Sequence, residues 1–238
     1  MKAIVMAGGK GTRLYPYSAA MPKPLMPVGE APVLELLLRR LTNAGINHAI
    51  LGVNHLRHLI EAFFGDGSRH GLKITYSLED QPLGTAGPIG MVIDELGEHF
   101  VVTNGDLLTT LDLRKMIDEH MRTGADATIG SYRKELKSEF GILEVDDHMR
   151  MTGYSEKPTF SHLVSMGVYV LKKSAVRPHV QAGQRLDMPD LMCLMCAANA
   201  DVRCFTGDFF WLDIGRPEDF ALAQKLVDEN PAYFDGAA

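Results

Sequence analysis

The chain has 238 residues, of which 46% are hydrophobic and 23% are charged. This composition is ordinary for a globular protein and excludes a disordered, collagen-like or coiled-coil chain. The length fits one large domain or two small ones. A net charge of −6 argues against a partner bound through a nucleic-acid backbone, so any bound phosphate must be met by local donors.

The sequence carries no signal for a membrane and none for export. It contains no run of ~18 apolar residues, and the apolar run at the N-terminus is too short for a signal peptide. Cys193 and Cys196 lie in the apolar segment 188–198, with Cys204 following, and no fourth ligand for zinc is at hand. We interpret Cys193 and Cys196 as core residues of a helix, and the chain as a reduced, cytoplasmic protein.

Strands and helices alternate in the first half of the chain. Apolar runs and residue spacing predict strands at 3–7, 48–53, 72–77 and 100–103, and helices at 34–41, 56–64 and 89–96. Gly45 is expected to close the first helix, and Thr85 to cap the third. Such alternation is typical of a parallel sheet that binds ligands beyond the carboxyl ends of its strands.

The second half is richer in strands. Strands are expected at 127–132, 140–145, 164–171 and 202–205, with helices at about 187–198 and 217–229. We predict an α/β fold with a Rossmann-like mixed, mainly parallel sheet flanked by helices and a small added sheet. Without a linker between the halves, residues 1–238 are expected to form one domain with two lobes, about 1–125 and 126–238.

A glycine cluster directly follows the first strand. Gly8, Gly9 and Gly11 would let backbone N–H groups close around a phosphate, and Arg13 offers a planar fork that matches phosphate oxygens. Alone, this segment would favour an ordinary glycine-rich turn. It fits neither the Walker A motif nor the dinucleotide-binding GxGxxG motif.

Further motifs follow in a fixed order along almost the whole chain. They are Pro22-Lys23-Pro24, Gln81 to Pro88, Asn104-Gly105-Asp106, Glu156-Lys157-Pro158, Gly167-Val168-Tyr169 and Trp211 to Gly215. Together with Gly8 to Leu14, this ordered set resembles the sugar-phosphate nucleotidylyltransferases. The resemblance implies condensation of a nucleoside triphosphate with a sugar 1-phosphate, giving a nucleotide-sugar and pyrophosphate.

The resemblance also implies roles for individual residues. Nucleotide binding would fall to Ala7, Gly8, Gly9, Gly11, Thr12, Gln81, Gly84 and Thr85, with Gly84 allowing the backbone to approach the base. The small added sheet would bind the sugar. The residues that bind the sugar phosphate would be Asn104, Gly141, Glu156, Lys157, Ser165 and Gly167. We expect a cytoplasmic enzyme that binds a nucleoside triphosphate and a sugar 1-phosphate and has no nucleic-acid or membrane partner. Whether it forms a homo-oligomer is left open.

The chemistry requires charge compensation rather than a general base. A phosphomonoester is already mostly dianionic at pH 7, since its second pKa is ~6. Arg13 and Lys23 suit the triphosphate, and Asp106 with Asp213 suit Mg²⁺ held by two carboxylates and phosphate oxygens. We therefore expect Arg13, Lys23 and Asp106 to be catalytic, with Asp106 and Asp213 as metal ligands.

The base and the sugar stay open. The residues Leu83 to Pro88 look most like those of mannose-1-phosphate and heptose-1-phosphate guanylyltransferases, which favours GTP. Uridylyl- or thymidylyltransferase activity on a sugar 1-phosphate, cytidylyltransferase activity on a non-sugar phosphate, and a non-catalytic relative are the alternatives. Ser165 replaces the usual Asn, and Met166 is expected to add an apolar wall to the sugar pocket. A C-terminal β-helix domain is not expected.

Overall fold

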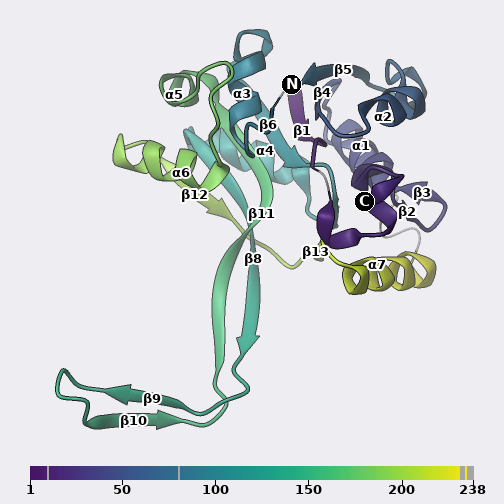
Figure 1. The fold of residues 1–238 in the computed structure, drawn as a ribbon. Coiled ribbons are helices and arrows are strands. Elements are labelled where there is room, and N and C mark those ends of the chain that lie inside the picture. Colours follow the sequence, from purple (N-terminus) through teal and green to yellow (C-terminus); the bar gives the residue numbers. More distant parts are fainter. Residues whose placement is uncertain (10, 80, 231–233, 235–238) are drawn as a thin grey trace.

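A computed structural model describes residues 1–9, 11–79, 81–230 and 234. Its centre is a seven-stranded sheet in the order β12-β8-β11-β6-β1-β4-β5 (Figure 1). The strands are β1 (Lys2–Met6), β4 (His48–Val53), β5 (Lys73–Leu78), β6 (His99–Asn104), β8 (Ala127–Lys137), β11 (Thr159–Lys172) and β12 (Val202–Phe205). β11 runs antiparallel to β6 and β8, whereas the other pairs are parallel, so the predicted mixed, mainly parallel sheet is confirmed.

Helices cover both faces of this sheet. The helices are α1 (Val33–Asn43), α2 (Arg57–Phe64) and α4 (Leu113–Thr123) on one face, and α3 (Gly87–Val92), α5 (Lys173–Val176) and α6 (Met188–Ala197) on the other. Side chains of β1 alternate between the two cores, with Ala3 and Val5 in the first and Ile4 in the second. None of the helices in the described part of the chain combines the length and apolarity that a membrane crossing requires.

Three strand pairs lie outside the central sheet. They are β2 (Pro27–Val28) with β3 (Ala31–Pro32), β7 (Leu107–Thr109) with β13 (Trp211–Asp213), and β9 (Ile142–Val145) with β10 (Met151–Ser155). Helix α7 (Pro217–Glu229) packs Ala223 and Val227 against a third apolar cluster that includes Leu108 and Ile214. The pairing of β7 with β13 ties the C-terminal segment to the loop that follows β6.

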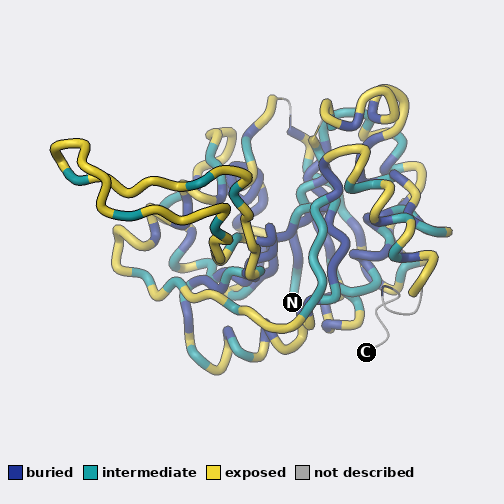
Figure 2. The backbone as a smooth tube through the Cα atoms, turned by 90° about the horizontal axis from the view of Figure 1, so that it is seen from below, coloured by how far each residue is buried: buried dark blue, intermediate teal, exposed yellow. Residues whose placement is uncertain are grey.

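Residues 131–165 form a long arm that projects from the body (Figure 1). Within it, β8 and β11 pair from Ser131 opposite Ser165 to Lys137 opposite Thr159. The hairpin of β9 and β10 lies at its tip. Most of the arm is exposed (Figure 2).

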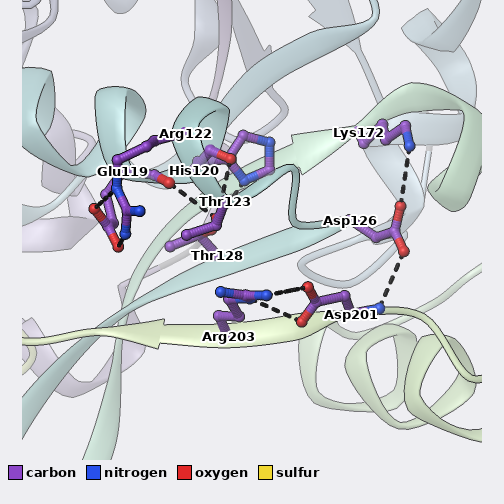
Figure 3. A network of polar contacts seen from close by, with 9 residues as sticks. All are labelled: Glu119, His120, Arg122, Thr123, Asp126, Thr128, Lys172, Asp201 and Arg203. Atoms are coloured by element: carbon purple, nitrogen blue, oxygen red, sulfur yellow. Dashed lines mark hydrogen bonds and ion pairs between the residues drawn. The ribbon is translucent and has the colours of Figure 1, made fainter.

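A polar network lies where α4 meets the sheet (Figure 3). His120 is fully buried, with Nδ1 2.9 Å from Thr128 Oγ1 and Nε2 2.9 Å from His99 Nδ1. Asp126 contacts Lys172 Nζ at 3.3 Å and accepts a hydrogen bond from the backbone of Asp201. These contacts join α4, β8 and β11 at the ends of the two strands that lie away from the arm.

Several expectations about elements were wrong. Helix α4 was missed, and α3 ends at Val92 and begins after Ala86 rather than at a Thr85 cap. Cys193 and Cys196 are exposed rather than buried, and Cys204 is also exposed. The reason is that α6 turns Met188, Leu191, Met192 and Met195 toward the core, which leaves Cys193 and Cys196 on the outer face.

Candidate active site

A cavity of about 370 Å³ opens at the carboxyl ends of the parallel strands. Its volume falls in the range of small-molecule sites. The residues that line it come from the segments following β1, β4, β5 and β6, which is where a parallel sheet places ligands. They are Met6, Gly8, Gly9, Asn54, Glu79, Pro82, Gly84, Thr85, Asn104 and Asp106.

A second cavity, of about 570 Å³, adjoins the first through Thr85 and Asn104, which line both. Its other lining residues are Ser165, Gly167, Tyr169, Asp187, Met188, Pro189 and Asp190. Two neighbouring compartments can hold two substrates side by side. Of the residues expected to bind the nucleotide, Gly8, Gly9, Gly84 and Thr85 line the first cavity, whereas Ala7, Gly11, Thr12 and Gln81 do not. Asn104, Ser165 and Gly167, expected to bind the sugar phosphate, line the second.

Lys23 joins the two aspartates expected at the reacting centre. Its ammonium group forms an ion pair with Asp106 Oδ2 and lies 3.3 Å from Asp213 Oδ1. The Lys23 side chain is only 10% exposed, and the flanking Pro22 and Pro24 fix the backbone of the short 3₁₀ turn that carries it. Asp106 directly precedes β7, and β13 pairs Asp213 with Leu107, so the two carboxylates become neighbours.

The surroundings of Asp106 suit a bound cation. Burial raises the pKa of Asp106; Lys23 opposes this shift, and the charge of Asp213 adds to it. Its Oδ1 is buried and has no hydrogen-bond partner among the described residues. A buried carboxylate oxygen without a partner is costly unless a cation or a donor from a ligand reaches it. Among the described residues, no group of three or more His, Cys, Asp or Glu side chains could hold a metal.

The glycine loop lies beside this centre. Arg13 is exposed, and its guanidinium would be 3.4 Å from a Cβ placed on Gly215, two residues beyond Asp213. Gly11 has a left-handed φ of 59° and starts the 3₁₀ turn of Thr12–Leu14. The N–H of Ala7 donates to Gly52 O and is therefore used by the fold. Lys10 lies outside the described residues.

The segment from Gln81 to Pro88 is held in place by the loop before α6. Thr85 N donates to Asp187 Oδ1, and Met188 N donates to Thr85 Oγ1. Gly84 has φ of 79°, and a Cβ there would meet Leu186 O at 2.5 Å. Packing against Leu186 therefore requires this glycine, whatever its distance from a base. Thr85 satisfies the first turn of α6 rather than capping α3.

Gly167 and Ser165 shape the second cavity. A Cβ on Gly167 would lie 2.5 Å from Asn104 Nδ2, so the glycine makes room for this amide. Ser165 Oγ lies 2.8 Å from Tyr169 Oη. The expectation that Met166 forms a wall of the pocket was wrong: it is fully buried in the core, because the irregular pairing between Ser165 and Tyr169 turns it inward.

Three residues expected to bind the sugar phosphate are not brought to either cavity. Gly141, Glu156 and Lys157 lie near the tip of the arm, and Tyr154 Oη donates to Glu156 Oε2 at 2.8 Å. Gln81 is exposed and absent from the residues that line the first cavity. The body of the molecule therefore brings together part of the expected nucleotide set and part of the expected sugar-phosphate set.

Sequence reasoning missed Glu79 and Asn54. Glu79 is buried, accepts from Leu83 N at 3.1 Å, and has its pKa raised by burial. Asn54 Nδ2 donates to Glu79 O. Each residue directly follows a parallel strand, β4 or β5, so the rule on carboxyl ends would have found both.

Known proteins place the chain in a family. The model of the nucleotidyl transferase family matches residues 2–230. The chain is 36% identical to a mannose-1-phosphate guanylyltransferase of Mycobacterium tuberculosis over 92% of its own length and 62% of that protein's. It is 33% identical to a UTP–glucose-1-phosphate uridylyltransferase of Synechocystis over 95% and 63%. It thus spans about three fifths of these two relatives.

A D-glycero-α-D-manno-heptose 1-phosphate guanylyltransferase of Aneurinibacillus thermoaerophilus is matched over nearly its whole length, with 31% identity over 94% of this chain and 97% of that one. The crystal structure of HddC from Yersinia pseudotuberculosis, complexed with GMP-PN, shares the fold with a TM-score of 0.72 and 24% identity, covering 94% and 98% of the two chains. The chain belongs to the nucleotidyl transferase family.

Proposed function

We propose that this protein transfers a nucleotidyl group from a nucleoside triphosphate, with GTP favoured, to a sugar 1-phosphate, releasing pyrophosphate. One observation carries the proposal. The cluster of Lys23, Asp106 and Asp213 has its buried aspartate on the wall of a cavity that adjoins a second cavity through Asn104 and Thr85. That arrangement suits two phosphorylated substrates that react where they meet.

The residues of the body would act by positioning and by compensating charge. The sugar phosphate attacks the α-phosphorus through an oxygen that is already ionised near pH 7, so no general base is required. Lys23, with Arg13 beside Gly215, would stabilise the charge that develops on the triphosphate and on the departing pyrophosphate. Gly8, Gly9, Gly11 and Thr12 would bind the nucleotide, in the lobe formed by about residues 1–125.

The residues present fit Mg²⁺. Asp106 offers a buried oxygen with no partner among the described residues, and Asp213 offers a second carboxylate beside it. Mg²⁺ is commonly held by one or two carboxylates with phosphate oxygens and water completing its shell. When bound, it would neutralise phosphate charge and orient the α-phosphate. In that state Lys23 would turn from the aspartates toward the phosphates.

GTP is favoured over UTP on two grounds. The relatives from Mycobacterium tuberculosis and Aneurinibacillus thermoaerophilus are named guanylyltransferases, whereas the Synechocystis relative is named a uridylyltransferase. In addition, Glu79 places a carboxylate in the first cavity, where it can accept from the N–H groups of guanine. Uridylyl or thymidylyl transfer to a sugar 1-phosphate is the alternative.

A screen of pyrophosphate release tests the proposal. Purified protein with Mg²⁺ is offered GTP, UTP, dTTP, CTP or ATP, each against a panel of hexose and heptose 1-phosphates and against choline phosphate. We expect release only with a sugar 1-phosphate and fastest release with GTP. Faster turnover with UTP would correct the base, and turnover with choline phosphate alone would overturn the sugar assignment.

A further inference from the structure

The outer part of the arm is supported only by itself among the described elements. β12 pairs with β8 only at Ala127 to Gly130, and β6 pairs with β11 only at Val168 to Lys172. Beyond these residues, the two strands have only each other as ladder partners, as far as Lys137 and Thr159. An isolated two-stranded ribbon is marginally stable in water. We therefore expect the arm to pack against another protein surface.

The side chains of the arm indicate what kind of surface that is. Phe140, Met149 and Met151 are 75%, 78% and 65% exposed, and Tyr154 is 59% exposed. Figure 2 shows the arm exposed along nearly its whole length. A concentration of large apolar side chains on a protruding element is typical of a protein–protein contact.

The second cavity lacks a cationic side chain, and the arm carries one. Its lining includes Asp187 and Asp190 but no Lys or Arg among the described residues. A sugar 1-phosphate brings about two negative charges at pH 7 and needs a cation there. Lys157, between β10 and the outer end of β11, is an exposed cation with φ of 45°. Such left-handed backbone is costly for a residue other than glycine and often marks a functional position.

Lys157 cannot reach the cavity of its own chain along this arm. Ser165 lines the cavity, and Thr159 lies six residues away along the same extended strand, which spans about 20 Å at ~3.3 Å per residue. Lys157 and Glu156 lie beyond Thr159. A sugar phosphate against Ser165 and Gly167 is therefore out of reach of Lys157 in the same chain.

We propose that two copies of this chain form a two-fold dimer in which the arm of each copy covers the second cavity of the other and brings Lys157 to the sugar phosphate there. This inference rests on the proposed function. The exposed apolar side chains of the arm become buried against the partner, and the acidic cavity receives its cation. Exchange of identical elements across a two-fold axis is a common route to a dimer.

A pair of inactive variants tests the exchange. Asp106→Asn removes a residue of the body, and Lys157→Ala removes the cation of the arm; each should lower kcat/KM for the sugar phosphate by about 100-fold, as expected for a lost charged contact. The two chains are co-expressed with different tags, and the heterodimer is purified by both. One of its two sites then combines an intact body with an intact arm, so about half of the wild-type activity should return.

The matched control pairs Asp106→Asn with Lys23→Ala. Both substitutions lie in the body, so neither site of that heterodimer is intact and activity should stay absent. Sedimentation should show a wild-type dimer and a monomeric Phe140→Asp. No recovery in the first heterodimer with an active wild type, full activity of Lys157→Ala, or a monomeric wild type would each overturn the exchange. An inactive wild type would instead count against the proposed function, and the sedimentation result still decides whether the arm makes a dimer.

Discussion

At the scale of single residues, Asp106 has a buried carboxylate oxygen for which we propose a cation as the partner. Its unpartnered buried oxygen and its ion pair with Lys23 favour a divalent cation over a purely structural role. We expect Asp106→Asn to lower turnover at ordinary Mg²⁺ by at least ~100-fold, since the amide keeps the shape but loses the charge. Asp208→Asn, an exposed aspartate, is the control for steady-state kinetics. Near-wild-type turnover of Asp106→Asn would remove this residue from the metal site.

Arg13 is predicted to act on the departing pyrophosphate. Its position beside Gly215 places the guanidinium near the segment that follows Asp213, the last residue of β13. Arg13→Ala should lower kcat by ~10²-fold, equivalent to ~2.7 kcal/mol of transition-state stabilisation. Arg13→Lys should recover only part of this loss, because the planar fork is gone. A change confined to the KM of the sugar phosphate would show that Arg13 contacts the other substrate.

Glu79 is predicted to discriminate between bases. The ionised carboxylate of Glu79 can accept hydrogen bonds from the N–H groups of guanine. Burial raises the pKa of Glu79 and so favours its protonated form when no base is bound. Glu79→Gln should therefore lower kcat/KM for GTP by ~10-fold or more and change that for UTP less. Kinetics with both nucleotides measure the ratio, with the exposed Glu30→Gln as the control. Equal losses for the two nucleotides would show that Glu79 supports the loop at Leu83 and does not read the base.

At the scale of elements, the sequence predicted the parts that rest on local pattern. β4, β12 and α7 have the expected bounds, because apolar runs and turn residues define them. The prediction failed where tertiary contacts decide. No local sequence pattern indicates that Thr85 accepts a hydrogen bond from Met188 N. None indicates that the strand starting at residue 127 and the strand ending near residue 171 extend outward as an arm. The motif residues Glu156 and Lys157 were found, but their distance from the cavity depends on the path of that arm.

Ser165 lies at the irregular point of β11 where the arm leaves the sheet, and it lines the second cavity, where we propose that the sugar phosphate binds. Its hydroxyl is engaged with Tyr169, so Ser165→Asn would introduce an amide at this edge and release the Tyr169 hydroxyl. We expect the order of kcat/KM among mannose, glucose, heptose and modified-hexose 1-phosphates to change. Thr206→Asn, an exposed position outside both cavities, serves as the control. An unchanged order would mean that Ser165 does not set sugar choice.

At the scale of the whole molecule, the cavities and the buried polar network around His120 lie at opposite ends of the strands. The cavities lie at the carboxyl ends of the strands, whereas the network of His120, Asp126 and Asp201 lies near the opposite ends (Figure 3). A perturbation of the His120 network should therefore change the free energy of unfolding with little effect on the kinetics.

The pH dependence of stability tests this separation. Burial, together with His99, lowers the pKa of His120 to about 4, while an unfolded histidine titrates near ~6.5. As pH falls from 6.5 toward 4, the unfolded chain binds a proton that the folded chain does not, so the free energy of unfolding falls, by up to about 3 kcal/mol. His120→Gln cannot titrate and should flatten this dependence in urea unfolding between pH 5 and 7. His148→Gln, on the exposed arm, should retain the wild-type slope. If His120→Gln also retains it, the buried imidazole is not the source of acid sensitivity.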